Sequence, residues 1–276
     1  MNGQVFDKKN EFEACTSTFF VFLRESISIH PAGGRKRDVG IAMFDFKQFR
    51  IDDRDCAMKV GTDGVLLGAW ADLAGVTSVV DIGCGSGLIA LMIAQRLGGC
   101  DCQVTGVEID PSSAAAARAN IGNSPWNGSV TVECMDFSGY GCKGGVDLIV
   151  SNPPFFTTGE RSPRQSRSMA RHKGGLSPES VIDYASMHLS PRGSVALIAP
   201  AEDEDELVFR AEMASLHPRR ISRVVSVAGR SPYRVMLQAC RADGPVSVDT
   251  IFIRETDGYT YTPQYRTLTK DFYLNF

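Results

Sequence analysis

An alternation of strand-like and helix-like segments, beginning at residue 77, constrains the fold of this chain more than any other feature. Apolar runs typical of buried strands lie at residues 77–82, 103–108, 129–135, 146–150 and 194–199. Segments with a helical pattern lie at residues 87–97, 111–121, 178–189 and 202–216. Repeated strand–helix–strand units predict a parallel sheet with helices on both faces. Three later runs are predicted to be antiparallel strands, at residues 221–228, 234–240 and 246–254.

The composition is that of an ordinary globular protein and argues against several classes. The chain has 276 residues, enough for one large α/β domain, with 43% hydrophobic and 22% charged residues. Its formal net charge is −3, so a nucleic-acid partner would have to be held by a local basic patch. Because no run of 18 apolar residues occurs and the N-terminus lacks a basic leader pattern, we expect neither a transmembrane helix nor a signal peptide.

The cysteines and histidines do not predict a metal site. The eight cysteines are scattered without a CxxC pair, and the four histidines lie far apart. This spacing is not that of a zinc site. We interpret the cysteines as reduced structural thiols of a cytoplasmic protein.

The first 42 residues differ in character from the rest of the chain. They are mixed in charge and show no sustained period, whereas Met43 begins a segment of different composition. We expect residues 1–42 to be a mobile N-terminal extension and residues 43–276 to form the domain. The alternative is a short strand at residues 19–29 that packs on the domain.

A glycine-rich turn comes after the first predicted strand of the alternation. It reads DIGCGSG from Asp81 to Gly87, where the first strand–helix turn of such a sheet holds a nucleotide-like ligand. Glycine lets the backbone turn tightly and approach the ligand. A dinucleotide fingerprint would place a third glycine where Ala90 stands, which disfavours an NAD-dependent dehydrogenase. The carboxylate of Asp81 would repel a pyrophosphate and attract a cationic amino-acid group.

Two more acidic residues lie at the ends of the next two predicted strands. Glu108 ends the second strand, at the distance where an acid binds ribose hydroxyls. Asp136 ends the third strand, and its carboxylate can accept a hydrogen bond from an adenine amine while Phe137 lies on the ring. Together with Asp81, these side chains suit a ligand with an amine, a ribose and an adenine. S-adenosylmethionine has those groups.

The fourth predicted strand ends in a stiff corner, Asn152-Pro153-Pro154-Phe155. Each proline fixes its own φ and pushes the preceding residue into an extended conformation. The corner therefore presents an amide side chain, free carbonyls and an aromatic face. Such a corner can bind a planar group that carries an NH2.

At this point the chain resembles the class I S-adenosylmethionine-dependent methyltransferases. The resemblance rests on VDIGCGSG at residues 80–87, then Glu108, Asp136 and the Asn152-to-Phe155 corner, in the order that family uses. It implies a Rossmann-like, mostly parallel seven-stranded sheet with an antiparallel C-terminal hairpin and helices on both faces. The asparagine–proline–proline–aromatic motif implies methylation of a planar amine: adenine N6, guanine N2 or a glutamine amide.

A second block of sequence resembles one particular family within this class. Residues 46–49, FKQF, and 56–70, CAMKVGTDGVLLGAW, are similar to the start of the tRNA1(Val) adenine-37 N6-methyltransferases. In that family the stretch from Lys59 to Gly64 closes over the cofactor, which makes Thr62 a candidate contact. The implied cofactor-binding residues are Thr62, Asp81, Gly83, Cys84, Gly85, Glu108, Asp136 and Phe137.

The resemblance implies a catalytic role for the corner. An exocyclic adenine amine is a poor nucleophile because its lone pair is delocalised into the ring. The Asn152 side-chain oxygen and the Pro153 carbonyl can each accept one N6 hydrogen, which frees the lone pair, while Phe155 stacks on the base. We expect catalysis by Asn152, Pro153, Pro154 and Phe155 to be mainly positioning, without a strong general base.

A basic stretch comes after the corner and suggests an RNA partner. It contains Arg161, Arg164, Arg167, Arg171 and Lys173 against one acid, which suits phosphate contacts. We expect tRNA as the partner, with no membrane or metal and a monomer favoured. Three other activities stay open: guanine-N2 methylation of rRNA, glutamine-N5 methylation of a protein, and RNA binding without catalysis on the same scaffold.

Overall fold

The computed structural model describes residues 43–98, 101–142, 144–155 and 175–276. The N-terminal extension expected at residues 1–42 lies outside the described residues. So do the five basic residues expected to bind RNA, at 161, 164, 167, 171 and 173.

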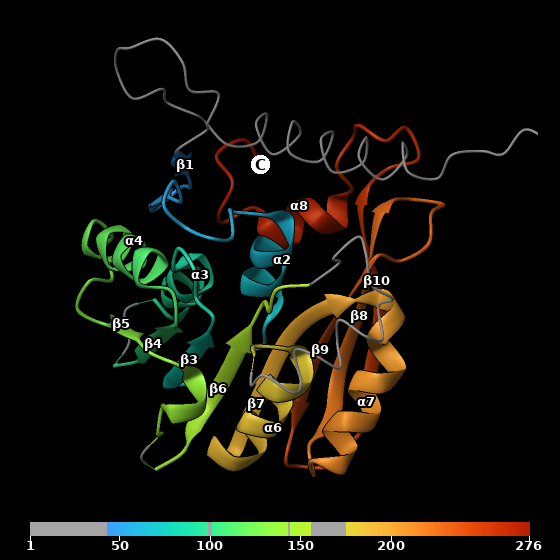
Figure 1. The fold of residues 1–276 in the computed structure, drawn as a ribbon. Helices are drawn as coiled ribbons and strands as arrows, with labels where there is room; N and C mark the ends of the chain where they lie inside the picture. The colour runs from blue at the N-terminus through green and yellow to red at the C-terminus, as the bar shows by residue number, and fades with distance from the viewer. Residues whose placement is uncertain (1–42, 99–100, 143, 156–174) are drawn as a thin grey trace, which may run out of the picture.

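An eight-stranded sheet forms the centre of the molecule, in the order β10-β8-β9-β7-β6-β3-β4-β5 (Figure 1). The strands are β3 (Ser78–Ile82), β4 (Gln103–Glu108), β5 (Val130–Cys134), β6 (Val146–Ser151), β7 (Leu189–Pro200), β8 (His217–Val227), β9 (Arg234–Cys240) and β10 (Ser247–Arg254). All neighbouring pairs are parallel except those that β9 makes with β7 and β8. The predicted α/β class with a mostly parallel sheet is confirmed.

The last strand departs from the expectation. The sheet has eight strands instead of seven, and β10, expected to be antiparallel, pairs in parallel with β8. The reason lies in the chain path. Cys240 at the end of β9 pairs with His217 at the start of β8, so a short connection brings the chain back to the end of the sheet where β8 begins. A strand that starts there and adds to the free edge of β8 runs in the same direction as β8.

Helices cover both faces of the sheet (Figure 1). One face is covered by α2 (Thr62–Trp70), α3 (Leu88–Leu97), α4 (Pro111–Gly122) and α8 (Pro263–Thr269). The other carries α6 (Pro178–His188) and α7 (Glu204–Met213). Each layer of helices encloses its own cluster of buried apolar side chains against the sheet. Short 3-10 turns lie at Phe137–Gly139 (η1) and Ala201–Asp203 (η2).

A small hairpin precedes α2 and packs beside α4. It consists of β1 (Met43–Asp45) and β2 (Arg50–Asp52), which pair antiparallel. The backbone of Asp52 exchanges two hydrogen bonds with the Asn120 side chain of α4, at 2.9 and 3.0 Å. The same Asn120 amide donates to the carbonyl of Ser86 in the glycine turn at 2.9 Å. One buried side chain thus connects the hairpin, α4 and the turn after β3.

Within the described residues, no helix is long and apolar enough to cross a membrane.

Candidate active site

The glycine turn leaves β3 at the carboxyl edge of the sheet. Gly83, Gly85 and Gly87 have φ angles of 68°, 54° and 81°, a region that side chains with a Cβ rarely adopt. The amides of Gly83 and Cys84 both donate to the carbonyl of Val107, at 2.8 and 3.3 Å, which holds the turn against β4. A Cβ on Gly85 would meet nothing within 4 Å, so the backbone there is open to an approaching ligand.

Cys84 points away from that opening. Its side chain is 7% exposed, and its sulfur occupies the space where a Cβ on Gly106 of β4 would come within 2.7 Å. Burial raises the pKa of this thiol well above its ordinary value. A ligand at the turn could therefore contact Cys84 only through its backbone.

Asp81 is the next-to-last residue of β3 and is completely buried. Its Oδ2 accepts a hydrogen bond from the amide of Ala90 in α3 at 3.1 Å. Its Oδ1 is buried and has no hydrogen-bond partner among the described residues. Burial raises the pKa of this carboxyl to about 7, and the charge of Glu108 adds to the shift. A buried oxygen without a donor is costly, and a cationic donor would relieve that cost.

Glu108, the last residue of β4, connects two loops at the same edge. Its Oε2 accepts from the amide of Gly85 at 2.9 Å, and its Oε1 accepts from the amide of Asp110 at 2.9 Å. Each carboxylate oxygen keeps a second lone pair for a ligand hydroxyl. Glu108 therefore shapes the glycine turn whether or not it also contacts a ribose.

The pair after β5 is held by its own local contacts. Asp136 is exposed, and its Oδ1 accepts from the amide of Ser138 at 2.9 Å, which caps η1. The ring of Phe137 is half-buried and meets Tyr184 of α6 edge-on, with centroids 5.6 Å apart. The second oxygen of Asp136 and part of the Phe137 ring stay available to a ligand.

The corner after β6 stands beside the glycine turn. Ser151, fully buried, donates from Oγ to the carbonyl of Ile82 at 2.8 Å and so fixes the end of β6 to the end of β3. The Oδ1 of Asn152 is shielded from solvent and has no hydrogen-bond partner among the described residues. Its Nδ2 lies 4.0 Å from the sulfur of Met58. Pro153 is buried, and Pro154 and Phe155 are half-buried.

Helix α2 begins next to this corner. A Cβ on Gly64 would lie 4.0 Å from Nδ2 of Asn152. Thr62, the first residue of α2, is only 7% exposed. The structure thus brings the first turn of α2, which contains the expected cofactor contact Thr62, close to the amide of the corner.

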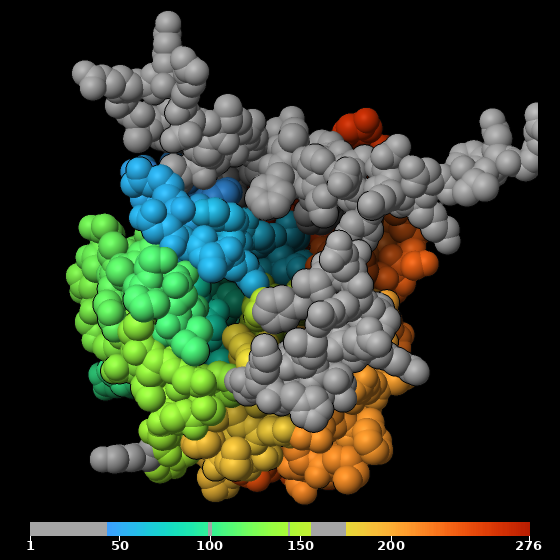
Figure 2. All heavy atoms as spheres, in the orientation of Figure 1, coloured from blue at the N-terminus to red at the C-terminus, as the bar shows by residue number. Residues whose placement is uncertain are grey.

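The segment from residue 52 to residue 61 leads from the hairpin to α2 and is fixed by polar contacts. The Lys59 ammonium donates to the carbonyls of Asp53 and Arg54 at 2.6 and 2.9 Å. The buried Asp53 carboxylate accepts from the amide of Val60 at 2.8 Å, and the amide of Ala57 donates to a serine hydroxyl of α4 at 3.1 Å. Figure 2 shows the hairpin and this segment in blue, against the green of α4 and beside a recess in the surface.

Sequence reasoning missed several residues of this neighbourhood. Met58 contacts the corner, Leu176 lies against the glycine turn, and Asp53 accepts from Val60 in the segment between the hairpin and α2. Asp63 of α2 pairs with Arg234, which the sequence suggests only as part of a basic group of arginines. Met58 and Asp63 lie inside the block that carries the family resemblance, which is the one available signal. Leu176 and Arg234 are distant in sequence from their partners.

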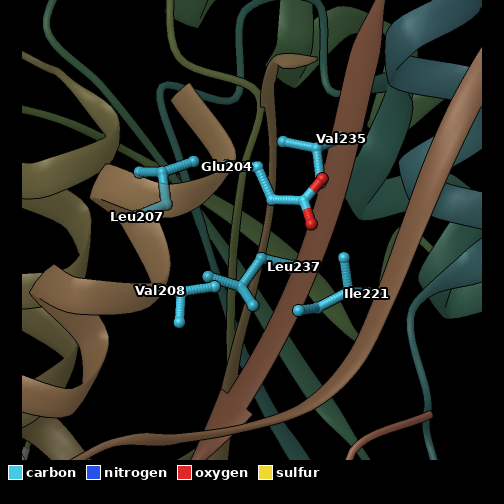
Figure 3. Close-up of a pocket in the computed structure, with 6 residues that line it drawn as sticks. All are labelled: Glu204, Leu207, Val208, Ile221, Val235 and Leu237. Carbon is cyan, nitrogen blue, oxygen red and sulfur yellow. The ribbon is translucent and has the colours of Figure 1, made fainter. Parts of the chain in front are cut away.

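A small gap in the packing under α7, without room for a water molecule, has different chemistry. Figure 3 shows its lining, the Glu204 carboxylate and five aliphatic side chains: Leu207, Val208, Ile221, Val235 and Leu237. One carboxylate among aliphatic groups offers an adenosine ligand no set of hydrogen-bond partners. Among the described residues, no cluster of three or more potential ligands could hold a metal ion.

The fold and the site together define a class I methyltransferase: a mostly parallel sheet with a glycine turn, carboxylates and an Asn-Pro-Pro-Phe corner at its carboxyl edge. The methyltransferase small domain family matches residues 64–210. A predicted O-methyltransferase of Agrobacterium tumefaciens has a similar structure, with a TM-score of 0.56 and 19% identity, over 76% of this chain and 96% of that one. This structural likeness supports the fold.

Relatives of higher sequence identity show which family of methyltransferases the chain belongs to. A tRNA1(Val) (adenine(37)-N6)-methyltransferase of Aeromonas hydrophila is 43% identical over 231 residues, covering 84% of this chain and 97% of the relative. Its counterpart in Trichodesmium erythraeum is 40% identical over 240 residues, covering 86% of this chain and 100% of the relative. The chain belongs to the tRNA1(Val) (adenine(37)-N6)-methyltransferase family.

The methyl donor of this class is S-adenosylmethionine, and the site fits it. The unpartnered Oδ1 of Asp81 suits the donor's ammonium group, and the open backbone at Gly85 allows close approach. The free lone pairs of Glu108 suit ribose hydroxyls. The candidate cofactor contacts thus come from β3, β4 and the turn between β3 and α3.

Proposed function

We propose that this protein methylates the N6 amine of adenine 37 in tRNA1(Val). The observation that carries the proposal is the Asn152 carbonyl oxygen, shielded from solvent and without a hydrogen-bond partner among the described residues, at the corner next to the glycine turn. A buried acceptor in that state is suited to an N–H donor of a substrate. The names of the relatives point to adenine 37 as that donor.

The chain's own residues would hold the methyl donor, which supplies an electrophilic methyl group when bound. Asp81 would bind its ammonium group, Glu108 its ribose, and Asp136 and Phe137 its adenine. The backbone of the turn and the first turn of α2 would complete the site. The residues concerned are Thr62, Asp81, Gly83, Cys84, Gly85, Glu108, Asp136 and Phe137.

The corner would act on the substrate amine. The Asn152 Oδ1 and the carbonyl of Pro153 each accept one N6 hydrogen, which draws the lone pair out of conjugation with the ring. The two prolines keep these acceptors in place, and Phe155 fixes the plane of the base by stacking. The N-methylated ammonium is acidic and loses its proton to water. Most of the acceleration then comes from orientation.

The tRNA would be bound outside the corner by charge. Arg161, Arg164, Arg167, Arg171 and Lys173 come after the corner in sequence and suit phosphate contacts. An anticodon-loop base is already partly unstacked, so turning it into the site costs less than in a duplex. We place the reaction in the cytoplasm, where tRNA is processed.

The decisive experiment is methyl transfer with labelled S-adenosylmethionine to total tRNA, followed by nucleoside analysis. We expect N6-methyladenosine as the labelled product. A tRNA1(Val) transcript with guanine in place of adenine 37 is the matched control and should stay unlabelled. Detection of N2-methylguanosine, or of label in protein alone, would overturn the proposal in favour of one of the other amines.

A further inference from the structure

Arg234, the first residue of β9, joins the corner to helix α2. Its Nε donates to Oδ2 of Asp63 at 2.7 Å. The central carbon of its guanidinium lies 4.6 Å from the ring centroid of Phe155. A single side chain therefore contacts a carboxylate of α2 and the aromatic ring of the corner at the same time.

Arg234 and Asp63 are partly sheltered from solvent, which strengthens the contacts of Arg234 with Asp63 and with the Phe155 ring. The side chains of Arg234 and Asp63 are 25% and 20% exposed. The hydroxyl of Tyr233 also donates to Asp63, at 3.5 Å, and the Arg234 guanidinium lies 5.1 Å from the Tyr233 ring. Asp63 lies in the first turn of α2, where the helix dipole favours a negative charge. The carboxylate is thus held in place and in turn fixes the guanidinium plane.

The corner needs such a support. Pro153 and Pro154 fix the backbone that leads to Phe155, but they do not fix the side-chain torsions of Phe155. The half-buried Phe155 ring packs against both clusters of buried apolar side chains, which restrict its rotamers in part. A guanidinium stacked on one of its faces favours a single orientation, and it attracts the ring through the negative potential of the π face.

We propose that Arg234 is a positioning residue for the target base, with Asp63 holding its guanidinium. This inference rests on the proposed function, in which Phe155 stacks on the adenine. In this arrangement the guanidinium of Arg234 lies over one face of the Phe155 ring, and the base would stack on the other. The contact also connects the helix that begins at Thr62 to the ring that fixes the base, so the positions of the cofactor side and the substrate side are coupled.

A matched pair of variants tests the proposal. Arg234→Gln removes the charge and the stacking plane. Arg223→Gln is the control, because Arg223 of β8 makes a comparable ion pair, with Glu204 at 2.6 and 2.7 Å, on the α7 side of the sheet. Figure 3 shows Glu204 beside Ile221 and Val235, among the side chains under α7.

We expect Arg234→Gln to lower kcat roughly tenfold while the S-adenosylmethionine Kd stays within about twofold, because lost orientation acts on turnover rather than on cofactor binding. Arg223→Gln should lower Tm by a similar amount and leave kcat within about twofold. Asp63→Asn should lower kcat in the same direction, and the double variant with Arg234→Gln should be no worse than the worse single variant.

A second readout needs no methyl transfer. An anticodon hairpin with 2-aminopurine at the target position should change its fluorescence on binding to the unaltered protein and to Arg223→Gln, and change less on binding to Arg234→Gln. Equal kcat and equal fluorescence change for the two arginine variants would overturn the positioning role. If the unaltered protein labels no adenine, the proposed function fails, and the fluorescence comparison still decides whether Arg234 orients a stacked base.

Discussion

At the scale of single residues, two buried oxygens that have no hydrogen-bond partner among the described residues carry most of the chemistry that we propose for this chain. The Oδ1 of Asp81 lies under the glycine turn and the Oδ1 of Asn152 at the corner. A folded protein rarely leaves such atoms unsatisfied, because each costs on the order of 1–3 kcal/mol. In the proposed function, an ammonium group would satisfy the first oxygen and an amine hydrogen the second.

We expect Asn152→Ala to abolish methyl transfer, with a loss of roughly 100-fold or more, because the variant lacks an acceptor for the developing positive charge. Calorimetric titration should give an S-adenosylmethionine Kd within about twofold of the unaltered protein, since the side chain faces the substrate. Near-normal turnover would refute the role of the amide.

Asp81 should make cofactor binding depend on pH. Its pKa of about 7 lies above the ordinary value, so the group is neutral at low pH in the free protein, whereas binding an ammonium requires the ionised form. We therefore expect S-adenosylmethionine affinity to rise between about pH 6 and pH 8. The Asp81→Asn variant should bind weakly, without that rise. A Kd for the unaltered protein that does not change over this range would contradict the assignment.

The same shift has a consequence for stability with a defined sign. Because the folded-state pKa is raised above the unfolded value of 3.8, the contribution of Asp81 to folding is fully present below that value. It is lost as the pH rises through about 7. Thermal unfolding without cofactor should therefore show Asp81→Asn gaining Tm over the unaltered protein at pH 8 but not at pH 4.

At the scale of elements, the Lys59 ammonium group is one of the polar groups that fix the segment between β2 and α2. Lys59→Met removes the two hydrogen bonds that Lys59 donates to the carbonyls of Asp53 and Arg54. We expect weaker cofactor binding, by roughly tenfold, because the chain leading to Thr62 loses its anchor. Lys47→Met is the control, since Lys47 also donates to two main-chain oxygens, of Lys270 and Phe276, at 2.5 and 3.0 Å. Equal Kd values for both variants would rule out a special role for the segment.

The glycine turn offers a second test at this scale. Gly83 has a positive φ, and a Cβ there would lie 2.4 Å from Cδ2 of Leu176. Gly75 has a similar φ of 72° with nothing within 4 Å of a Cβ. We expect Gly75→Ala to cost about 1 kcal/mol of unfolding free energy and Gly83→Ala about 2 kcal/mol more. The added methyl group at residue 83 is also too close to the Leu176 side chain.

The outcome depends on Leu176. In chemical denaturation, the double variant of Gly83→Ala with Leu176→Ala should recover part of the excess cost relative to Leu176→Ala alone. If Gly83→Ala costs no more than Gly75→Ala, the close contact with Leu176 is not what requires glycine at this position.

Elements differ in how far the sequence could predict them. The α4 helix is signalled locally, since Asp110 caps it and Pro111 takes its first position. Helix α2 has no such local signal. All its residues except Asp63 are buried, and a helix that is buried on all sides shows no amphipathic period. The glycine turn and the corner are likewise local signals, and both lie where the sequence placed them, at the carboxyl ends of β3 and β6.

At the scale of the whole molecule, the unpredictable contacts are those between distant segments. Asp63 and Arg234 are separated by 171 positions, and neither pattern around them predicts the other. The direction of β10 also depends on the path of β8 and β9, and the run of residues 246–254 alone cannot predict it. The type of most elements is signalled locally, whereas the Arg234 contact with the corner arises only when the sheet has formed.

We expect residues 43–276 to fold without the first 42 residues. The hairpin that begins at Met43 already packs its apolar side chains, such as Phe44 and Phe46, into the large core cluster. A chain lacking residues 1–42 should therefore keep its Tm within about 3 °C of the full chain, because the packing of this hairpin is retained. A fall of many degrees would show that the preceding residues belong to the domain.

The position of β9 affects how this protein emerges from the ribosome. Strand β7 pairs with β9 along its outer edge, and β9 ends at Cys240, about 40 residues after the end of β7 at Pro200. At about 5–20 residues per second, translation of that stretch takes roughly two to eight seconds. During this interval the nascent chain carries an open strand edge rich in aliphatic side chains, which another chain can join. Aggregation during synthesis should therefore concentrate between the appearance of β7 and that of β9.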